Sequence, residues 1–245
     1  AQVCMKLRDY DAAESAARRG LSLDPHHKEG HFVLANALRR LGRNEESQEL
    51  LKDFKLLDQK LDKIEDQLRM LGNNPEDHEA RAMLGLLYSE QGRYSEALEA
   101  YRIATRLAPD SLSYQNNLGN MYFRLGDNEA AIRAYEIAIK LDSSYPEAHY
   151  NIGQVYLDKQ LFSEAHKSFH SALKLNPQHA YANYFMGLLY ARDNDFSSAV
   201  VVLEKAVAAI PSFLDARQKL AVAYLKTGQV VESKSQLKKI RELQE

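Results

Sequence analysis

A pair of histidines has the most recognisable chemical spacing in this 245-residue chain. His166 and His170 lie four residues apart, so a helix would bring both imidazoles to one face, an arrangement that can hold zinc. No glutamate that could serve as a metalloprotease base stands between them, and Glu164 is no obvious third ligand. We therefore expect no metal and no other cofactor, and we interpret His166 as a packing residue.

The chain carries no recognisable nucleophile or phosphate-binding motif. Its single cysteine, Cys4, excludes an intrachain disulfide and a cysteine-based zinc site, and no catalytic signature surrounds it. The glycine patterns of a hydrolase elbow, a phosphate-binding loop and a dinucleotide site are absent. We predict that this chain is not an enzyme.

Amide and aromatic side chains favour binding rather than catalysis. An asparagine side chain donates and accepts hydrogen bonds at once, so a row of them can hold a peptide backbone whatever its side chains are. Aromatic rings bordered by polar groups commonly anchor protein interfaces. The amide candidates are Asn116, Asn117, Asn120, Asn151 and Gln154, and the aromatic ones are Phe123, Tyr150, Tyr181, Tyr184 and Phe185.

A fixed spacing places these side chains on a repeating framework. Five tyrosines follow one another at intervals of 34 residues, and a small residue stands three positions before each of them. Such a period is typical of stacked supersecondary units rather than of one globular core. The tyrosines are Tyr88, Tyr122, Tyr156, Tyr190 and Tyr224, and the small residues are Gly85, Gly119, Gly153, Gly187 and Ala221.

Each unit is predicted to contain two helices joined by a turn. Apolar residues spaced by three and four lie on one face of a helix. Where two helices cross closely, a glycine or alanine lets the axes approach, and a neighbouring ring such as Tyr135 or Phe169 fills the space between ridges. Turn signals such as Gln91-Gly92 separate the helices, and Pro109 ends a second helix.

These positions recur in phase over 78–245, and the chain resembles the tetratricopeptide-repeat family there. The resemblance implies an all-α solenoid, a right-handed superhelix of stacked helix-turn-helix hairpins, whose family role is to hold partner proteins. One departure is the missing tryptophan, which the family often has three residues before the apolar position. Its absence puts one contact within the hairpin in doubt. The residues in its place are Arg81, Gln115, His149, Asn183 and Arg217.

We expect a single array over 1–245 in which one repeat is irregular. No glycine or proline lies between Arg43 and Leu71, and apolar residues there step alternately by four and three, as in a heptad seam. This pattern favours one elongated second helix over 44–71, although a break near Leu57–Gln59 that would give two helices stays open. The seam residues are Leu50, Phe54, Leu57, Leu61, Ile64, Leu68 and Leu71, and the expected repeats are 1–27 (partial), 28–77 (with the extended helix), 78–111, 112–145, 146–179, 180–213 and 214–245 (terminal repeat or cap).

The resemblance also implies that first helices line a concave groove, to which we assign the amide and aromatic candidates named above. Two interpretations stay open for each group. The amides either grip a peptide, as in the asparagine-lined arrays of protein O-glycosyltransferases, or play a solvated or intra-array role. The rings either anchor a partner or pack between adjacent first helices. A carboxylate clamp is not expected, because Glu147 and Tyr181 stand where basic residues would be needed.

We predict a scaffold that binds a peptide or protein segment in this groove. One alternative is the substrate-recruiting arm of a larger enzyme, because Ala1 aligns with Gly85 in mid-helix and suggests a fragment with an open N-terminal end. Another is a homo-oligomeric platform that uses that end or the 44–71 helix. A net charge of −2 argues against nonspecific nucleic-acid binding, and no apolar run is long enough to span a membrane. The single cysteine favours the cytoplasm, although a periplasmic protein without disulfides would look the same.

Overall fold

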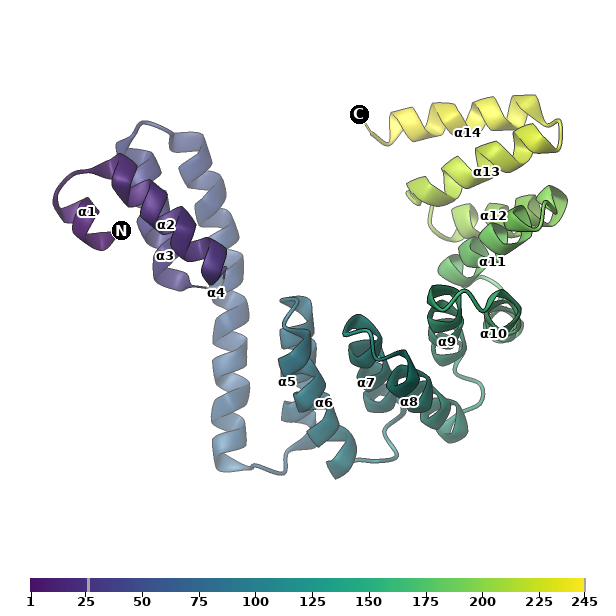
Figure 1. Cartoon of the computed structure of the whole chain (residues 1–245), viewed down its shortest axis with the longest axis horizontal. Coiled ribbons are helices and arrows are strands. Elements are labelled where there is room, and N and C mark those ends of the chain that lie inside the picture. Colours follow the sequence, from purple (N-terminus) through teal and green to yellow (C-terminus); the bar gives the residue numbers. More distant parts are fainter. Residues whose placement is uncertain (26, 245) are drawn as a thin grey trace. The chain divides into compact units, whose positions relative to one another are not determined.

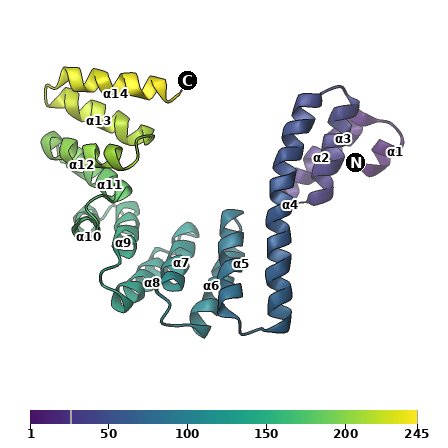
Figure 2. The same cartoon turned by 180° about the vertical axis from the view of Figure 1, so that it is seen from behind.

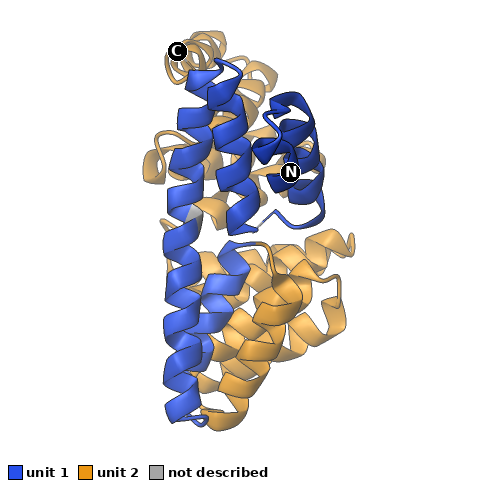
Figure 3. Ribbon diagram, turned by 90° about the vertical axis from the view of Figure 1, so that its left-hand side faces the viewer, with its two compact units in different colours: residues 1–91 blue, residues 92–245 orange. Residues whose placement is uncertain are grey.

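The computed structural model describes residues 1–25 and 27–244, and all regular structure in these two ranges is helical (Figures 1 and 2). The helices group into two compact units, Ala1–Gln91 and Gly92–Glu245 (Figure 3), and each is described by itself. Unit 1 contains α1 (Gln2–Lys6), α2 (Tyr10–Leu23), α3 (Lys28–Arg40), α4 (Asn44–Asn73) and α5 (His78–Glu90). Unit 2 contains α6 (Tyr94–Leu107), α7 (Leu112–Arg124), α8 (Asn128–Leu141), α9 (Pro146–Asp158), α10 (Phe162–Leu175), α11 (Ala180–Arg192), α12 (Phe196–Ala209), α13 (Leu214–Lys226) and α14 (Val230–Glu242).

The elongated helix of unit 1 is confirmed as one uninterrupted helix, α4, of 30 residues. Its first half packs against α3 and its second half against α5 (Figure 3). Lys28, at the start of α3, lies 2.8 Å from the Asp58 carboxylate and 3.1 Å from that of Asp62, so the N-terminal end of α3 lies near the middle of α4. Because no glycine or proline interrupts 43–71, nothing in the local chemistry favours a break near residue 58.

The heptad seam of α4 is divided between burial and exposure. Ile64 and Leu71 are buried, whereas Leu68 is 48% exposed. Leu57 was also assigned to the seam, but its side chain lies outside the described residues. The seam therefore packs only partly inside unit 1, through Ile64 and Leu71.

Unit 2 repeats one helix-crossing contact in three successive hairpins. A Cβ atom built on Gly119 would lie 2.5 Å from the Tyr135 ring, one on Gly153 would lie 2.6 Å from Phe169, and one on Gly187 would lie 2.5 Å from Leu203. No real Cβ makes contacts this short, so the glycine is what allows each pair of helices to approach. The predicted pairing of a small residue with a large one is therefore observed directly.

The turn inside each of these hairpins contains one residue in the left-handed region. Gly126 and Gly228 occupy this position with φ of 82°, as the sequence predicts. Gln160 and Asn194 adopt the same conformation at the intervening positions, with φ of 58° and 62°. The geometry of the turn is thus imposed by the stack, even where the sequence supplies no glycine.

Four of the five residues in the place of the family tryptophan bind the turn that precedes their own helix. His149 lies 3.3 Å from the carbonyl of Ser143 and therefore donates from Nε2. The other three side chains donate to proline carbonyls six residues earlier: Gln115 to Pro109 at 3.4 Å, Asn183 to Pro177 at 3.0 Å and Arg217 to Pro211 at 2.8 Å. A polar contact to the backbone thus replaces a packed ring, and it orders the loop between repeats.

The terminal hairpin α13/α14 is less fully packed than the others. Ile240 and Ser233 of α14 are buried, and the Ser233 hydroxyl donates to the carbonyl of Ala221 at 2.8 Å. Two other apolar residues of this helix, Val230 and Leu237, remain nearly half exposed. The amphipathic pattern of α14 is therefore anchored mainly through Ile240.

Candidate protein-binding face

The sequence-predicted site residues all come from the first helices of three hairpins in unit 2. We define the first-helix face as the surface of α7, α9, α11 and α13 that is turned away from their partner helices α8, α10, α12 and α14 (Figure 1). Contacts join α7 to α9 and α11 to α13, and aromatic rings join α9 to α11. The face is therefore continuous across the four hairpins.

Three of the predicted amides hydrogen-bond within the array. The Asn151 side chain donates to Asn116 Oδ1 at 2.9 Å, which links α9 to α7, and Asn116 is only 6% exposed. Asn120 accepts a hydrogen bond of 2.8 Å from the hydroxyl of Tyr135. Burial raises the pKa of Tyr135, so its hydroxyl keeps the proton that it donates. These contacts support an intra-array role for Asn116, Asn120 and Asn151.

Asn117 and Gln154 have a different environment. Both are half-buried, and neither side chain makes a hydrogen bond to any residue that the structure describes. Each therefore keeps its donor and acceptor groups available at the first-helix face. They are the amides best placed to meet a peptide backbone.

Two of the predicted aromatic residues are largely packing residues. Phe123 packs against the buried cluster that contains Tyr135 and Ile152. Phe185 stacks on the buried ring of Phe169, with 5.5 Å between the ring centroids and 7° between the planes. Both rings support the stacking of hairpins, as the packing interpretation predicts.

The other three rings form a belt across α9, α11 and α13 with two residues that sequence reasoning missed. Tyr150 lies 4.6 Å from the ring of His179 and 6.4 Å from Tyr181, measured between centroids. Phe213 lies 5.2 Å from Tyr181 and 4.9 Å from Tyr184. We call these five residues the ring belt. Tyr181, at its centre, is 48% exposed, which is unusual for a large aromatic side chain in a closely packed helical array.

His179 and Phe213 stand just before the first helices, outside the positions that helical spacing selects. His179 is the N-cap of α11 and accepts a hydrogen bond of 3.1 Å from the backbone amide of Ala182 through Nδ1. Phe213 occupies the N-cap position of α13. The only sequence signal for them is a ring at the residue that precedes a first helix.

Acidic residues lie in the first turns of α9 and α13, the two first helices that flank α11. Glu147, Tyr181 and Asp215 occupy equivalent positions of α9, α11 and α13, 34 residues apart. Burial, and secondarily the Asp215 carboxylate, raises the pKa of Tyr184. The pKa of His179 is lowered by burial, and the Glu147 carboxylate only partly offsets this effect. His179 is therefore a neutral ring at pH 7.

Charged side chains in the last turns of the first helices contact residues of the preceding hairpin. The guanidinium of Arg192 lies 3.5 Å from the ring centroid of Phe162, and the amine of Lys226 lies 6.0 Å from that of Phe196. Asp158 accepts a hydrogen bond of 2.9 Å from Asn128 at the corresponding place. Each contact joins a first helix to the start of the preceding second helix, so these groups stabilise the stack.

Family models for the repeat match most of the chain. A model described as TPR repeat matches residues 85–126 and 119–160. Two models described as tetratricopeptide repeat match residues 150–212, and residues 5–65 and 190–244. The chain belongs to the tetratricopeptide-repeat family. The all-α hairpin architecture predicted from the 34-residue period is confirmed.

Several solved structures share this tetratricopeptide fold, whereas no curated protein matches the chain. The crystal structure of MamA is 26% identical over 66% of this chain and 94% of its own, with a TM-score of 0.56. YrrB, described as a TPR protein with an unusual peptide-binding site, is 20% identical over 73% of this chain and 92% of its own, with a TM-score of 0.54. PilF of Pseudomonas aeruginosa is 17% identical over 88% of this chain and 91% of its own, with a TM-score of 0.64.

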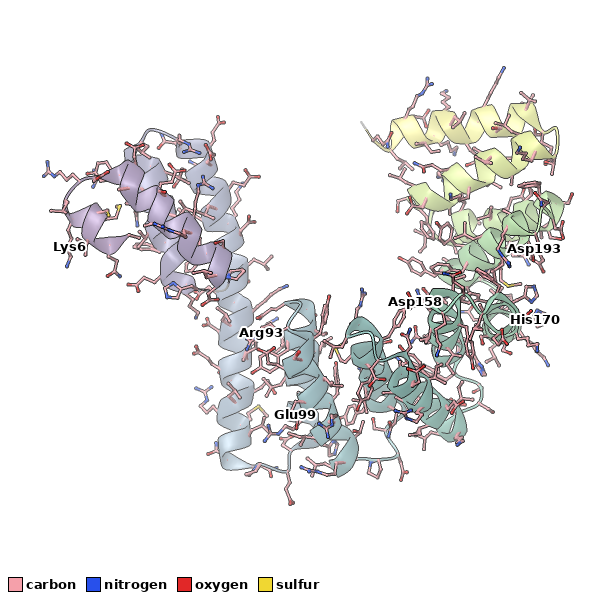
Figure 4. The ribbon with its side chains drawn as sticks, viewed as in Figure 1. Lys6, Arg93, Glu99, Asp158, His170 and Asp193 are labelled. Carbon is pink, nitrogen blue, oxygen red and sulfur yellow. The ribbon has the colours of Figure 1, made fainter. Side chains whose placement is uncertain are left out.

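The histidine pair of this tetratricopeptide-repeat protein does not form a metal centre with any other described residue. His166 meets the ring of Tyr190 edge-on, with 5.6 Å between centroids, as a packing residue would. His170 is exposed and lies on the side of α10 away from α9 (Figure 4). Among residues 1–25 and 27–244 no three His, Cys, Asp or Glu side chains are grouped to hold a metal ion, and no helix is long and apolar enough to span a membrane.

Proposed function

We propose that the first-helix face of unit 2 binds a segment of another protein. The family and the fold support a non-enzymatic protein-interaction scaffold. The observation that carries the finer proposal is the ring belt, which runs over three adjacent first helices and leaves Tyr181 half exposed. The peptide-binding site named for YrrB gives a precedent for such a role on this fold.

The two kinds of side chain on this face would contribute different parts of the binding free energy. The ring belt offers apolar area on side chains with few rotatable bonds, so little conformational entropy is lost when a partner covers it. Asn117 and Gln154 can pair with the main chain of an extended segment. Each contact is modest, and the affinity should arise from several hairpins together.

The test uses a variant that leaves the packing of the array intact. Tyr181→Ala with Gln154→Ala removes one exposed ring and one amide that has no partner among the described residues. Partners captured on the intact chain are identified, purified and titrated against both proteins. We expect the double variant to bind about tenfold or more weakly, because an exposed aromatic anchor commonly contributes more than 1 kcal/mol to binding.

A matched control separates this face from the rest of the molecule. Arg133→Ala with Glu136→Ala changes two exposed residues of the second helix α8 and should leave the affinity unchanged. All proteins should melt at the same temperature. If the Tyr181/Gln154 variant binds its purified partner as tightly as the parent, the first-helix face is not the binding site.

A cavity in unit 1 favours self-association as a second candidate function. It has a volume of about 430 Å³, and its lining includes Val3, Ala16, Ala17 and Val33. Val3 and Phe32 are more than half exposed beside it, so an apolar surface of a second copy would find matching area here. Light scattering that shows only monomers at high protein concentration would dismiss this candidate.

A further inference from the structure

The exposed centre of the ring belt lies between two carboxylates. Tyr181 stands at the second residue of α11, and the equivalent residues of the neighbouring first helices are Glu147 and Asp215. Glu147 is half-buried and Asp215 is exposed. Neither carboxylate forms an ion pair with a lysine, arginine or histidine in the described part of the chain. Both charges are therefore available to a partner.

The positive groups on these helices do not form ion pairs with the two carboxylates in the described part of the chain. His179, the titratable ring closest to Tyr150, is neutral at pH 7, since burial lowers its pKa. The bases at the last turns, such as Arg192 and Lys226, stack on rings at the opposite ends of the first helices. Lys219 lies one turn along α13 from Asp215 without an ion pair between them. A ring face flanked by two unpaired carboxylates attracts positive charge.

We propose that the segment bound at the ring belt is basic, with a lysine or arginine placed over Tyr181 between Glu147 and Asp215. This inference rests on the proposed function and adds the chemistry of the partner to it. A cation over a tyrosine face gains from the ring quadrupole, and the aliphatic stem of lysine or arginine covers the neighbouring rings. The two carboxylates add long-range attraction, which speeds association and selects against acidic segments.

Three synthetic peptides distinguish this proposal from general peptide binding. They share a twelve-residue glycine–serine–proline framework and differ only at four positions, which carry lysine, glutamine or glutamate. Titration of the intact chain at low ionic strength should rank them lysine, glutamine, glutamate, with about tenfold between the first two. Raising the salt from about 50 to 500 mM should remove most of that preference, because exposed charges are screened.

Variants of the chain show which residues cause the preference for the lysine peptide. Glu147→Gln with Asp215→Asn should weaken binding of the lysine peptide about three- to tenfold and leave the glutamine peptide unchanged. Tyr181→Ala should weaken both. Lys219→Ala should strengthen binding of the lysine peptide, since it removes a nearby positive charge. The control variant Glu136→Gln with Glu164→Gln also removes two negative charges, but on second helices, and should have no effect.

Two results would overturn the inference, and they differ in what else they imply. If the lysine and glutamine peptides bind equally and Tyr181→Ala weakens both, the face binds peptides without charge selection and the proposed function stands. If the lysine peptide binds the Glu147/Asp215 variant as tightly as it binds the Glu136/Glu164 control, the attraction comes from the overall charge of the chain and not from these two carboxylates. The basic-segment proposal is then wrong. Titration of a purified natural partner against the Tyr181/Gln154 variant tests the proposed function independently of these two peptide results.

Discussion

The interior of the hairpins and the first-helix face of unit 2 follow different rules. In the interior, one contact recurs: a glycine of the first helix lies against Tyr135, Phe169 or Leu203 of the second. On the face, equivalent positions vary along the array: the residues 34 apart beginning at Asn117 are asparagine, asparagine, phenylalanine and lysine. Positions that repeat maintain the stack, whereas positions that vary are free to determine what the stack binds.

The largest effect on stability is expected from a substitution inside a hairpin. Gly153→Ala adds one methyl group where a Cβ atom would lie 2.6 Å from the fully buried ring of Phe169. Alanine favours a helix over glycine by about 0.5–1 kcal/mol, but overpacking costs about 1–3 kcal/mol, so the variant should unfold at lower urea concentration. The measurement is the urea midpoint followed by circular dichroism.

Gly20→Ala provides the matched control for this change. Gly20 is also helical, in α2, but nothing lies within 4 Å of a Cβ atom built there. The same chemical substitution should therefore stabilise the chain by up to about 1 kcal/mol. Equal effects of the two substitutions would show that the close helix crossing contributes nothing specific.

The repeating interior could be predicted from sequence because each helical hairpin repeats the same local packing problem. The period of 34 residues identified the glycine and ring positions, and the lack of glycine or proline favoured the single helix that α4 proves to be. What periodicity could not give was the division of α4 between α3 and α5, because that depends on which helix lies alongside each half. Leu68 is exposed and Ile64 buried although both belong to one regular seam.

The face was harder to predict because its contacts cross from one hairpin to the next. The hydrogen bond between Asn151 and Asn116 depends on the rotation between adjacent hairpins, which no single repeat encodes. His179 and Phe213 were missed because they precede the helices, where helical spacing has no meaning. The polar residues in the place of tryptophan were noticed, but their hydrogen bonds to the preceding turn, as for Asn183, required the loop geometry.

A substitution in one of the turns between helices should increase stability. Gln160 holds φ at 58° where Gly126 and Gly228 stand in other hairpins. A left-handed conformation costs a residue with a side chain about 1–2 kcal/mol more than glycine, part of which is offset by the greater freedom of glycine in the unfolded chain. Gln160→Gly should raise the free energy of unfolding by roughly 0.5–1 kcal/mol without affecting binding. The converse variant, Gly126→Ala, should lower it, and a loss of stability in Gln160→Gly would mean that the glutamine side chain contributes to the turn.

The smallest expected effect concerns His179, which belongs to both regions because it caps α11 and contacts Tyr150 in the ring belt. Burial holds its pKa below the ordinary value of 6.5, so below that pH the unfolded chain binds a proton that the folded chain resists. Stability from this group is therefore complete above about pH 6.5 and is lost as the pH falls through the lower pKa of the folded state.

The variant His179→Asn tests this, because asparagine is also a good N-cap residue. It should change stability at pH 7 by only a few tenths of a kcal/mol, and it should reduce the loss of stability between pH 6.5 and 5. Thermal melts across this range test it, with His170→Asn, which removes an exposed histidine, as the control. If the stability of the His179→Asn variant falls with pH as steeply as that of the parent, the group that takes up the proton is not His179.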